Sequence, residues 1–228
     1  MSFNDPTSAR AADAALGRGE AVARTDSRAV FGQVMGLVAV TVAFTAAGAY
    51  IGRDLNGGIG IAFFIGALAC VFGLNVAAKR SEPLAIVLLF TLGLLLGLAV
   101  GPVINYYAKS DPGVVWQSAG ATAAFVGGLG AYGYATRRDF SNWARTLFWL
   151  LLALIVVGVV LIFVNIPGGN LIYAVLGLVL FGAYTIFDFN RLRRAHMDDS
   201  VLIATGIFLD VANIFLFFLQ IFGGGGRR

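Results

Sequence analysis

Long apolar blocks, separated by short polar stretches, fill the chain from residue 29 to residue 222. A helix needs about 20 consecutive apolar residues to cross the hydrocarbon core of a bilayer. The blocks are continuous rather than alternating, which argues against a membrane β-barrel. The pattern therefore predicts an all-α polytopic membrane protein with seven transmembrane helices. The predicted spans are residues 29–51, 59–78, 84–102, 114–135, 146–165, 170–190 and 200–222.

Short polar connections divide the chain into three predicted parts. Residues 1–27 are a polar tail, residues 28–222 a seven-helix transmembrane domain, and residues 223–228 a flexible Gly/Arg tail. The connections carry helix-breaking residues such as Ser110-Asp111-Pro112-Gly113, which favour turns between the spans. We therefore expect no inserted soluble domain.

Composition supports the same class of protein. Hydrophobic residues make up 59% of the chain and charged residues 12%, whereas soluble domains average about 25% charged residues. The single cysteine, Cys70, lies inside an apolar block, so we interpret it as a small buried residue rather than a ligand or disulfide partner. The lipid bilayer is the expected partner, and the net charge of +4 does not indicate nucleic acid, because the basic residues lie at the ends of the spans.

The basic residues also predict the orientation of the chain. If the N-terminus lies inside, twelve Lys and Arg residues fall on the inner side, and the outer loops hold only Arg53 and Lys109. The C-terminal pair Arg227-Arg228 lies outside if all seven spans cross, and inside if the last segment re-enters. Such a bias is typical of cytoplasmic loops. Residues 1–27 lack the apolar core of a secretory signal. We therefore expect a cytoplasmic N-terminus and a bacterial inner (plasma) membrane, with an organelle membrane as the alternative.

Two acidic residues, Asp188 and Asp210, lie inside predicted spans. A charged side chain at the middle of a membrane helix costs about 2.5–3.5 kcal/mol on insertion scales and usually marks a functional pathway. Asp210 is central in its span, so a functional role is favoured for it. Asp188 is close to the end of its span, where a polar residue alone would need no special explanation.

The last two spans should form an antiparallel hairpin, because their connection is short. If the turn is centred near Asp199 and the sixth helix continues through residues 191–194, then Asp188 and Asp210 are each eleven residues from the turn. Both would lie at the same height, about 16 Å from it. The nearest amides, Asn190 and Asn213, are then expected to donate hydrogen bonds to the pair.

Two carboxyl groups in a dry site cannot both ionise cheaply, so the pair is expected to share a proton over some range near neutrality. Ionised carboxylates, together with amide and carbonyl oxygens, suit a hard cation such as Ca²⁺. Transient Ca²⁺ binding at Asp188 and Asp210 is therefore a candidate function. The candidate basic partners are Lys79, Arg80 and Arg191, for which a purely topological role is the alternative.

Several other functions lack the residues that they need. The last span has no lysine for a retinal linkage, and the only histidine, His196, lies in a loop. Clusters of His and Cys with metal-ligand spacing and phosphate-binding glycine loops are absent from the sequence. We therefore expect neither an enzyme nor a bound cofactor.

The final hairpin resembles a known family. Tyr184-Thr-Ile-Phe-Asp-Phe-Asn-Arg191 and Leu209-Asp-Val-Ala-Asn-Ile-Phe215 are similar to the aspartate-bearing ends of the last two helices of the Bax inhibitor-1 family (transmembrane Bax-inhibitor-motif proteins), in particular its bacterial members. The resemblance covers about residues 28–222. It implies a bundle in which the last helix is enclosed by the other six.

The resemblance also implies a pH-sensitive Ca²⁺ leak controlled by an aspartate pair, which maps onto Asp188 and Asp210. In bacterial members, an arginine at the inner end of the second helix can latch one aspartate. Here the matching stretch contains Lys79, the better aligned residue, and Arg80. Lysine lacks the bidentate fork of arginine, so the latch would be weaker at Lys79 or would shift to Arg80.

Two other functions stay open. The first is the regulation of other membrane proteins, such as a quality-control protease, through the polar tail, which the resemblance to some bacterial relatives of the family implies. A proton-coupled carrier would use the same aspartate pair and would show a substrate-dependent proton flux.

Overall fold

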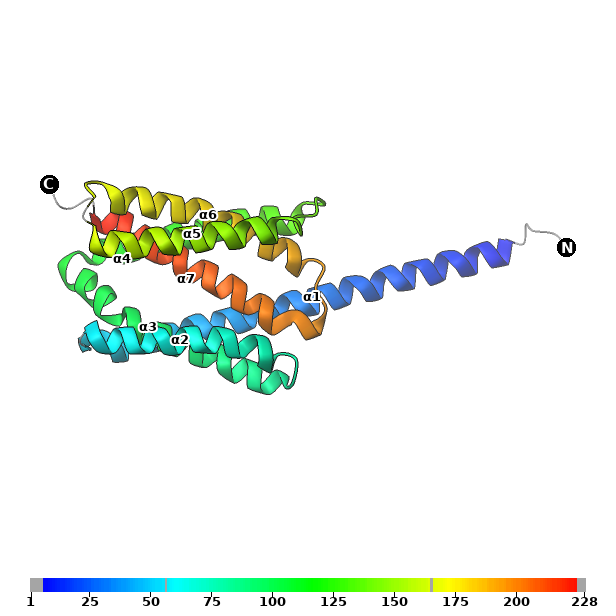
Figure 1. Ribbon diagram of the computed structural model, residues 1–228. Coiled ribbons are helices and arrows are strands. Elements are labelled where there is room, and N and C mark those ends of the chain that lie inside the picture. Colours follow the sequence, from blue (N-terminus) through cyan, green and yellow to red (C-terminus); the bar gives the residue numbers. More distant parts are fainter. Residues whose placement is uncertain (1–5, 56, 165, 225–228) are drawn as a thin grey trace.

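The computed structural model describes residues 6–55, 57–164 and 166–224, with side chains from Ser27 onward except for Gly57. These residues form seven α-helices and two short 3-10 helices (Figure 1). The helices are α1 (Pro6–Ile51), η1 (Gly52–Asp54), α2 (Gly57–Ala77), α3 (Glu82–Ser110), α4 (Pro112–Ala135), α5 (Trp143–Phe163), α6 (Gly169–Leu192), η2 (Met197–Asp199) and α7 (Ser200–Gly224).

The seven predicted helices are confirmed, although several bounds differ. The helix α1 has 46 residues, because it begins at Pro6 and continues into the predicted first span. Its first part extends well beyond the bundle (Figure 1). The predicted polar tail is therefore helical from Pro6 onward, and residues 1–5 and 225–228 lie outside the described residues.

Six of the helices are long and apolar enough to cross a membrane. The exception is α4, which is rich in glycine and alanine but has 24 residues. At 1.5 Å per residue it is about 36 Å long, which exceeds the roughly 30 Å of the hydrocarbon core. Its length therefore suits the same layer as the other six helices.

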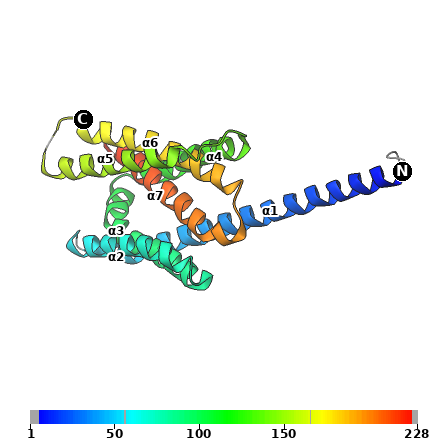
Figure 2. The same ribbon diagram turned by 45° about the vertical axis from the view of Figure 1, so that its right-hand side comes forward.

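The helix α7 lies at the centre of the bundle. It packs against α1, α2, α3, α4 and α6, and it runs between the group α1, α2, α3 and the group α4, α5, α6 (Figure 1, Figure 2). Half of its most apolar stretch is buried, against 6% for α5, which packs chiefly on α6. The prediction that the last helix is the enclosed one is confirmed.

Glycine residues bring α1 and α3 into close contact. Gly93, Gly97 and Gly101 follow one face of α3, and a Cβ atom at Gly97 would collide with the backbone carbonyl of Thr45 on α1. Small residues allow membrane helices to approach in this way. The two helices are therefore joined along a tight seam.

Candidate functional site

Asp188 on α6 and Asp210 on α7 are both buried inside the bundle. Their exposed fractions are 7% and 3%, and the two helices pack directly on one another. The carboxyl groups are close enough to interact electrostatically. The structure therefore brings the two predicted residues into one site.

The two aspartates are not level with each other, contrary to the expected symmetry. A Cβ atom at Gly206 would collide with the Asp188 carboxylate, so Asp188 lies opposite Gly206. Asp210 lies instead opposite Thr185, whose hydroxyl group is beside its carboxyl group. Gly206 and Asp210 are four residues apart on α7, so the backbone positions of the two aspartates are offset along the bundle by roughly one turn, about 6 Å.

The offset arises at the end of α6. The helix stops at Leu192, and α7 begins at Ser200. The turn is therefore centred on the loop of residues 193–199 and not near Asp199. The expectation that the sixth helix continues through residues 191–194 is wrong, and Asp188 is nearer to the turn than Asp210.

The surroundings of Asp210 leave one oxygen without a partner. Its Oδ2 atom is buried and accepts no hydrogen bond from the described residues. The Thr185 hydroxyl donates to the Phe181 carbonyl oxygen at 2.8 Å, so its oxygen stays available as an acceptor. A protonated Asp210 can donate to that oxygen, and the site thus has a place for one proton.

The two predicted amides do not serve the pair. The Asn190 side chain is fully buried, but its Nδ2 donates to the carbonyl oxygens of Gly133 at 3.2 Å and Arg138 at 3.0 Å. The Asn213 amide donates to the Leu209 carbonyl oxygen at 2.7 Å, one turn back on its own helix. Both predictions are corrected, because nearby backbone carbonyls take the donors.

The basic candidates differ in their relation to the pair. Lys79 and Arg80 are exposed just after the end of α2, and no ion pair joins them to either aspartate within the described ranges. Arg191 is exposed on the last turn of α6 and interacts electrostatically with Asp188. The structure thus places Arg191, rather than the second helix, beside the site.

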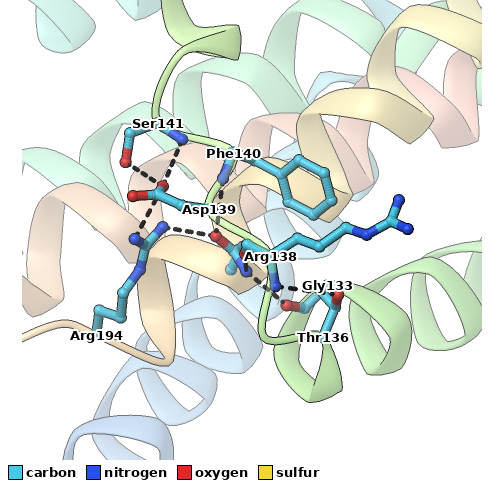
Figure 3. Close-up of polar contacts among 8 residues, drawn as sticks. Gly133, Thr136, Arg138, Asp139, Phe140, Ser141 and Arg194 are labelled. Carbon is cyan, nitrogen blue, oxygen red and sulfur yellow. Dashed lines mark hydrogen bonds and ion pairs between the residues drawn. The ribbon is translucent and has the colours of Figure 1, made fainter.

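A polar network beneath the site was not expected from the sequence (Figure 3). Arg194 forms an ion pair with Asp139 at 2.8 Å and donates to Asn190 Oδ1 at 2.6 Å. Asp139 also accepts hydrogen bonds from the backbone and hydroxyl groups of Ser141 at 2.8 and 2.6 Å. The network fastens the end of α6, which carries Asp188, to the loop between α4 and α5.

Asp139 is fully exposed, yet its environment favours the ionised form. The Ser141 hydroxyl and backbone N–H groups, followed by Arg194, lower the pKa of Asp139 to about 2. Hydrogen bonds and a nearby cation stabilise a carboxylate in this way. The only hint in the sequence was Asp139, a single acidic residue in a loop predicted to lie on the same side of the membrane as the basic residues after α6.

The aspartate pair lacks the ligand set of a tight metal-binding centre. No cluster of three or more His, Cys, Asp or Glu residues occurs within the part of the chain that the structure describes. Tight Ca²⁺ sites use six to eight oxygen ligands. Two carboxyl groups alone fit a weak, transient cation contact.

Comparison with known proteins shows the family of the chain. A family model described as "Inhibitor of apoptosis-promoting Bax1" matches residues 27–227, which include all seven spans. The chain belongs to the Bax inhibitor-1 family, as its final hairpin indicated, and it is an integral membrane protein.

The relatives include bacterial, animal and viral proteins. The chain is 30% identical to an uncharacterised membrane protein of Vibrio cholerae, over 72% of this chain and 70% of that protein. It is 32% identical to protein lifeguard 4 of Mus musculus, over 70% and 66% of the two chains. It is also 30% identical to a Golgi anti-apoptotic protein of vaccinia virus, over 71% and 67%.

Proposed function

We propose that this protein is a pH-sensitive Ca²⁺ (cation) leak channel in which Asp188 and Asp210 form the gate. The observation that carries the proposal is the buried Asp210 Oδ2 atom, which has no hydrogen-bond partner in the described chain and lies on the central helix beside a second buried carboxyl group. Ionisable groups inside a bundle usually mark ion or proton pathways.

The chemistry of the pair gives the proposed gate two states. With one proton, Asp210 donates to the Thr185 oxygen or to the neighbouring carboxylate, and α6 and α7 stay together. Without the proton, two negative charges repel each other and recruit a cation. Ca²⁺ fits as cargo, because it prefers oxygen ligands and tolerates irregular geometry.

Arg191 is the standing basic neighbour of Asp188 in this proposal. Lys79 and Arg80 are exposed just after α2, so either would reach the pair only after a movement of that helix. The positive-inside pattern supports a cytoplasmic N-terminus and a bacterial inner membrane. The proposed activity is transport without an enzymatic step.

Ca²⁺ flux into proteoliposomes, measured between pH 6 and pH 8, tests the proposal. Asp188→Asn and Asp210→Asn, singly and together, should change the flux and flatten its pH dependence, because each removes a titrating carboxyl group. Asp198→Asn is the matched control, since Asp198 is exposed in the turn of the same hairpin. Identical flux across this range in the wild type and both single variants would end the gating proposal.

One observation favours a second function, the regulation of other membrane proteins. The helix α1 continues beyond the bundle toward Pro6 (Figure 1), and a projecting helix can offer a docking surface to a partner such as a quality-control protease. Deletion of residues 1–27 should then abolish partner regulation and leave Ca²⁺ flux intact. Loss of flux in the deletion variant would instead assign the tail to the channel.

A further inference from the structure

A long apolar trough runs between α1 and α4, with α7 as its floor. Its volume is about 1220 Å³. On α1 it is lined from Ser27 to Ala49, a rise of about 33 Å, which matches the roughly 30 Å of a bilayer core. The trough therefore crosses the whole apolar layer.

Two aromatic side chains narrow the trough near one end, where its lining continues past them to Ser27 and Arg28. Phe31 of α1 and Tyr134 of α4 meet there in an edge-to-face contact, with ring centroids 5.2 Å apart. Between Trp116 and Tyr134, α4 lines the trough mostly with small residues, and a Cβ atom at Gly127 would meet nothing within 4 Å. The two helices therefore leave room between them along most of their length.

Water is a poor occupant for this space. A buried water needs two to four polar partners, whereas the lining consists almost entirely of apolar side chains. An unfilled space would forfeit the dispersion contacts of its walls. Within a bilayer, a lipid acyl chain can fill the space and supply these dispersion contacts.

Charge decides which lipid fits. Arg28 lines the trough one turn from Phe31, is exposed, and has no ion-pair partner among the described residues. Arg137 and Arg138, also exposed, follow shortly after Tyr134 on the neighbouring loop. No acidic side chain occurs among the described residues that line the trough. A guanidinium group at the end of an apolar trough suits a phosphate with acyl chains attached.

We propose that the trough between α1 and α4 binds an anionic phospholipid of the surrounding bilayer, with an acyl chain in the trough and the headgroup phosphate at Arg28. The acyl chain would contact Phe208, Val211 and Ala212 of α7, the side of that helix turned away from Thr185 and α6. The proposal concerns a different face of α7 from the aspartate pair and does not depend on ion flux.

Native mass spectrometry of the detergent-solubilised full chain, titrated with phosphatidylglycerol or phosphatidylcholine, tests this site. Arg28→Ala should weaken phosphatidylglycerol binding about fivefold and phosphatidylcholine binding by less, because one surface cation contributes about this factor toward an anionic lipid, whereas the choline cation offsets the phosphate charge. Arg145→Ala is the matched control: Arg145 is also exposed, follows the same polar loop as Arg137, and does not line the trough. It should bind phosphatidylglycerol like the wild type.

Two adjacent glycines test the predicted position of the acyl chain. Gly127→Leu places a side chain in the trough and should weaken binding of both lipids about tenfold, through loss of roughly two buried methylene groups. Gly128→Leu is the control, since Gly128 also has open space around it but does not line the trough.

Equal lipid binding by the Gly127 and Gly128 variants would overturn the acyl site. Equal phosphatidylglycerol binding by Arg28→Ala and Arg145→Ala would overturn the headgroup assignment. If the wild type is a dimer that Gly127→Leu dissociates while lipid binding is unchanged, the occupant is a second copy of the chain, and the lipid proposal fails.

Discussion

The two faces of α7 are built in different ways. Toward α6 the helix is packed so closely that Gly206 leaves just enough room for the Asp188 carboxylate, and Asp210 is buried beside Thr185. Toward α1 and α4 the same helix is apolar and forms the floor of a trough of about 1220 Å³. The protein thus fixes its charged groups with its own helices and leaves an apolar face for the bilayer to cover.

Gly206 and Gly127 show the difference between the closely packed face and the open face of the bundle at single positions. A Cβ atom at Gly206 has no room, whereas a Cβ atom at Gly127 meets nothing within 4 Å. Glycine is therefore required for close approach at one position and tolerated at the other. Substitutions at Gly206 and Gly127 should therefore have different effects on stability.

The largest effect is expected from Gly206→Leu. The added side chain must displace the Asp188 carboxylate and separate α6 from α7, which should lower the free energy of unfolding by about 3 kcal/mol, as overpacking does. Reversible unfolding in mixed micelles measures it. Gly127→Leu, in the open trough, should change stability by less than about 1 kcal/mol; similar losses for both variants would show that the two faces do not differ.

Asn190→Ala should destabilise the protein by about 2 kcal/mol. It leaves the buried carbonyl oxygens of Gly133 and Arg138 without their amide donor, and unsatisfied buried groups carry penalties of this size. Asn213→Ala is the control, because that amide donates only within its own helix, and it should cost under about 1 kcal/mol in the same unfolding assay. A loss at Asn213 equal to that at Asn190 would contradict the assigned importance of the network.

Alanine at the two glycines should give effects of opposite sign. Gly127→Ala should stabilise the helix by about 0.5–1 kcal/mol, because alanine loses less conformational entropy than glycine. Gly206→Ala should destabilise, since its Cβ atom collides with Asp188. Thermal melting in one detergent compares the pair directly, and a stabilising Gly206→Ala would disprove the close contact.

The smallest effect concerns pH. The pKa of Asp139 is lowered to about 2 by Ser141 and then Arg194, below the roughly 3.9 of an unfolded chain. Its contribution to stability is therefore complete above about pH 4 and is lost as the pH falls from about 4 through 2. The melting temperature of Asp139→Asn should lie slightly below that of the wild type at pH 6, and the gap should close between pH 4 and pH 2. A gap that persists at pH 2 would exclude this titration as its source.

The sequence was sufficient to predict the helices and to select Asp188 and Asp210. A continuous apolar segment, and an acidic residue inside such a segment, are both local signals. Their register was not predictable, since it depends on α6 ending at Leu192, where the loop of residues 193–199 begins. The partner of Asn190 also depends on tertiary structure: the loop that receives its amide lies more than 50 residues earlier in the chain.

The trough between α1 and α4 was also not predictable from the sequence. Its walls come from α1 and α4, which are separated in the chain by two complete helices. No feature of the sequence of α1 or of α4 predicts that the two helices leave space between them. Small residues in membrane helices usually indicate close packing, as the glycines of α3 show, and the same interpretation would apply to the glycines of α4. That interpretation holds for Gly130, which packs against the Phe189 ring, but not for Gly127 or Gly128.

The length of α1 has a mechanical consequence. Forty-six helical residues form a rod of about 69 Å, and its inner half is joined to α3 through the glycine seam. Because α1 is one continuous helix, a force applied to its projecting end would act as a torque on α1 and α3 together. Because α4 is not part of that seam, such a torque would change the width of the trough before it disturbed the packing of α6 on α7.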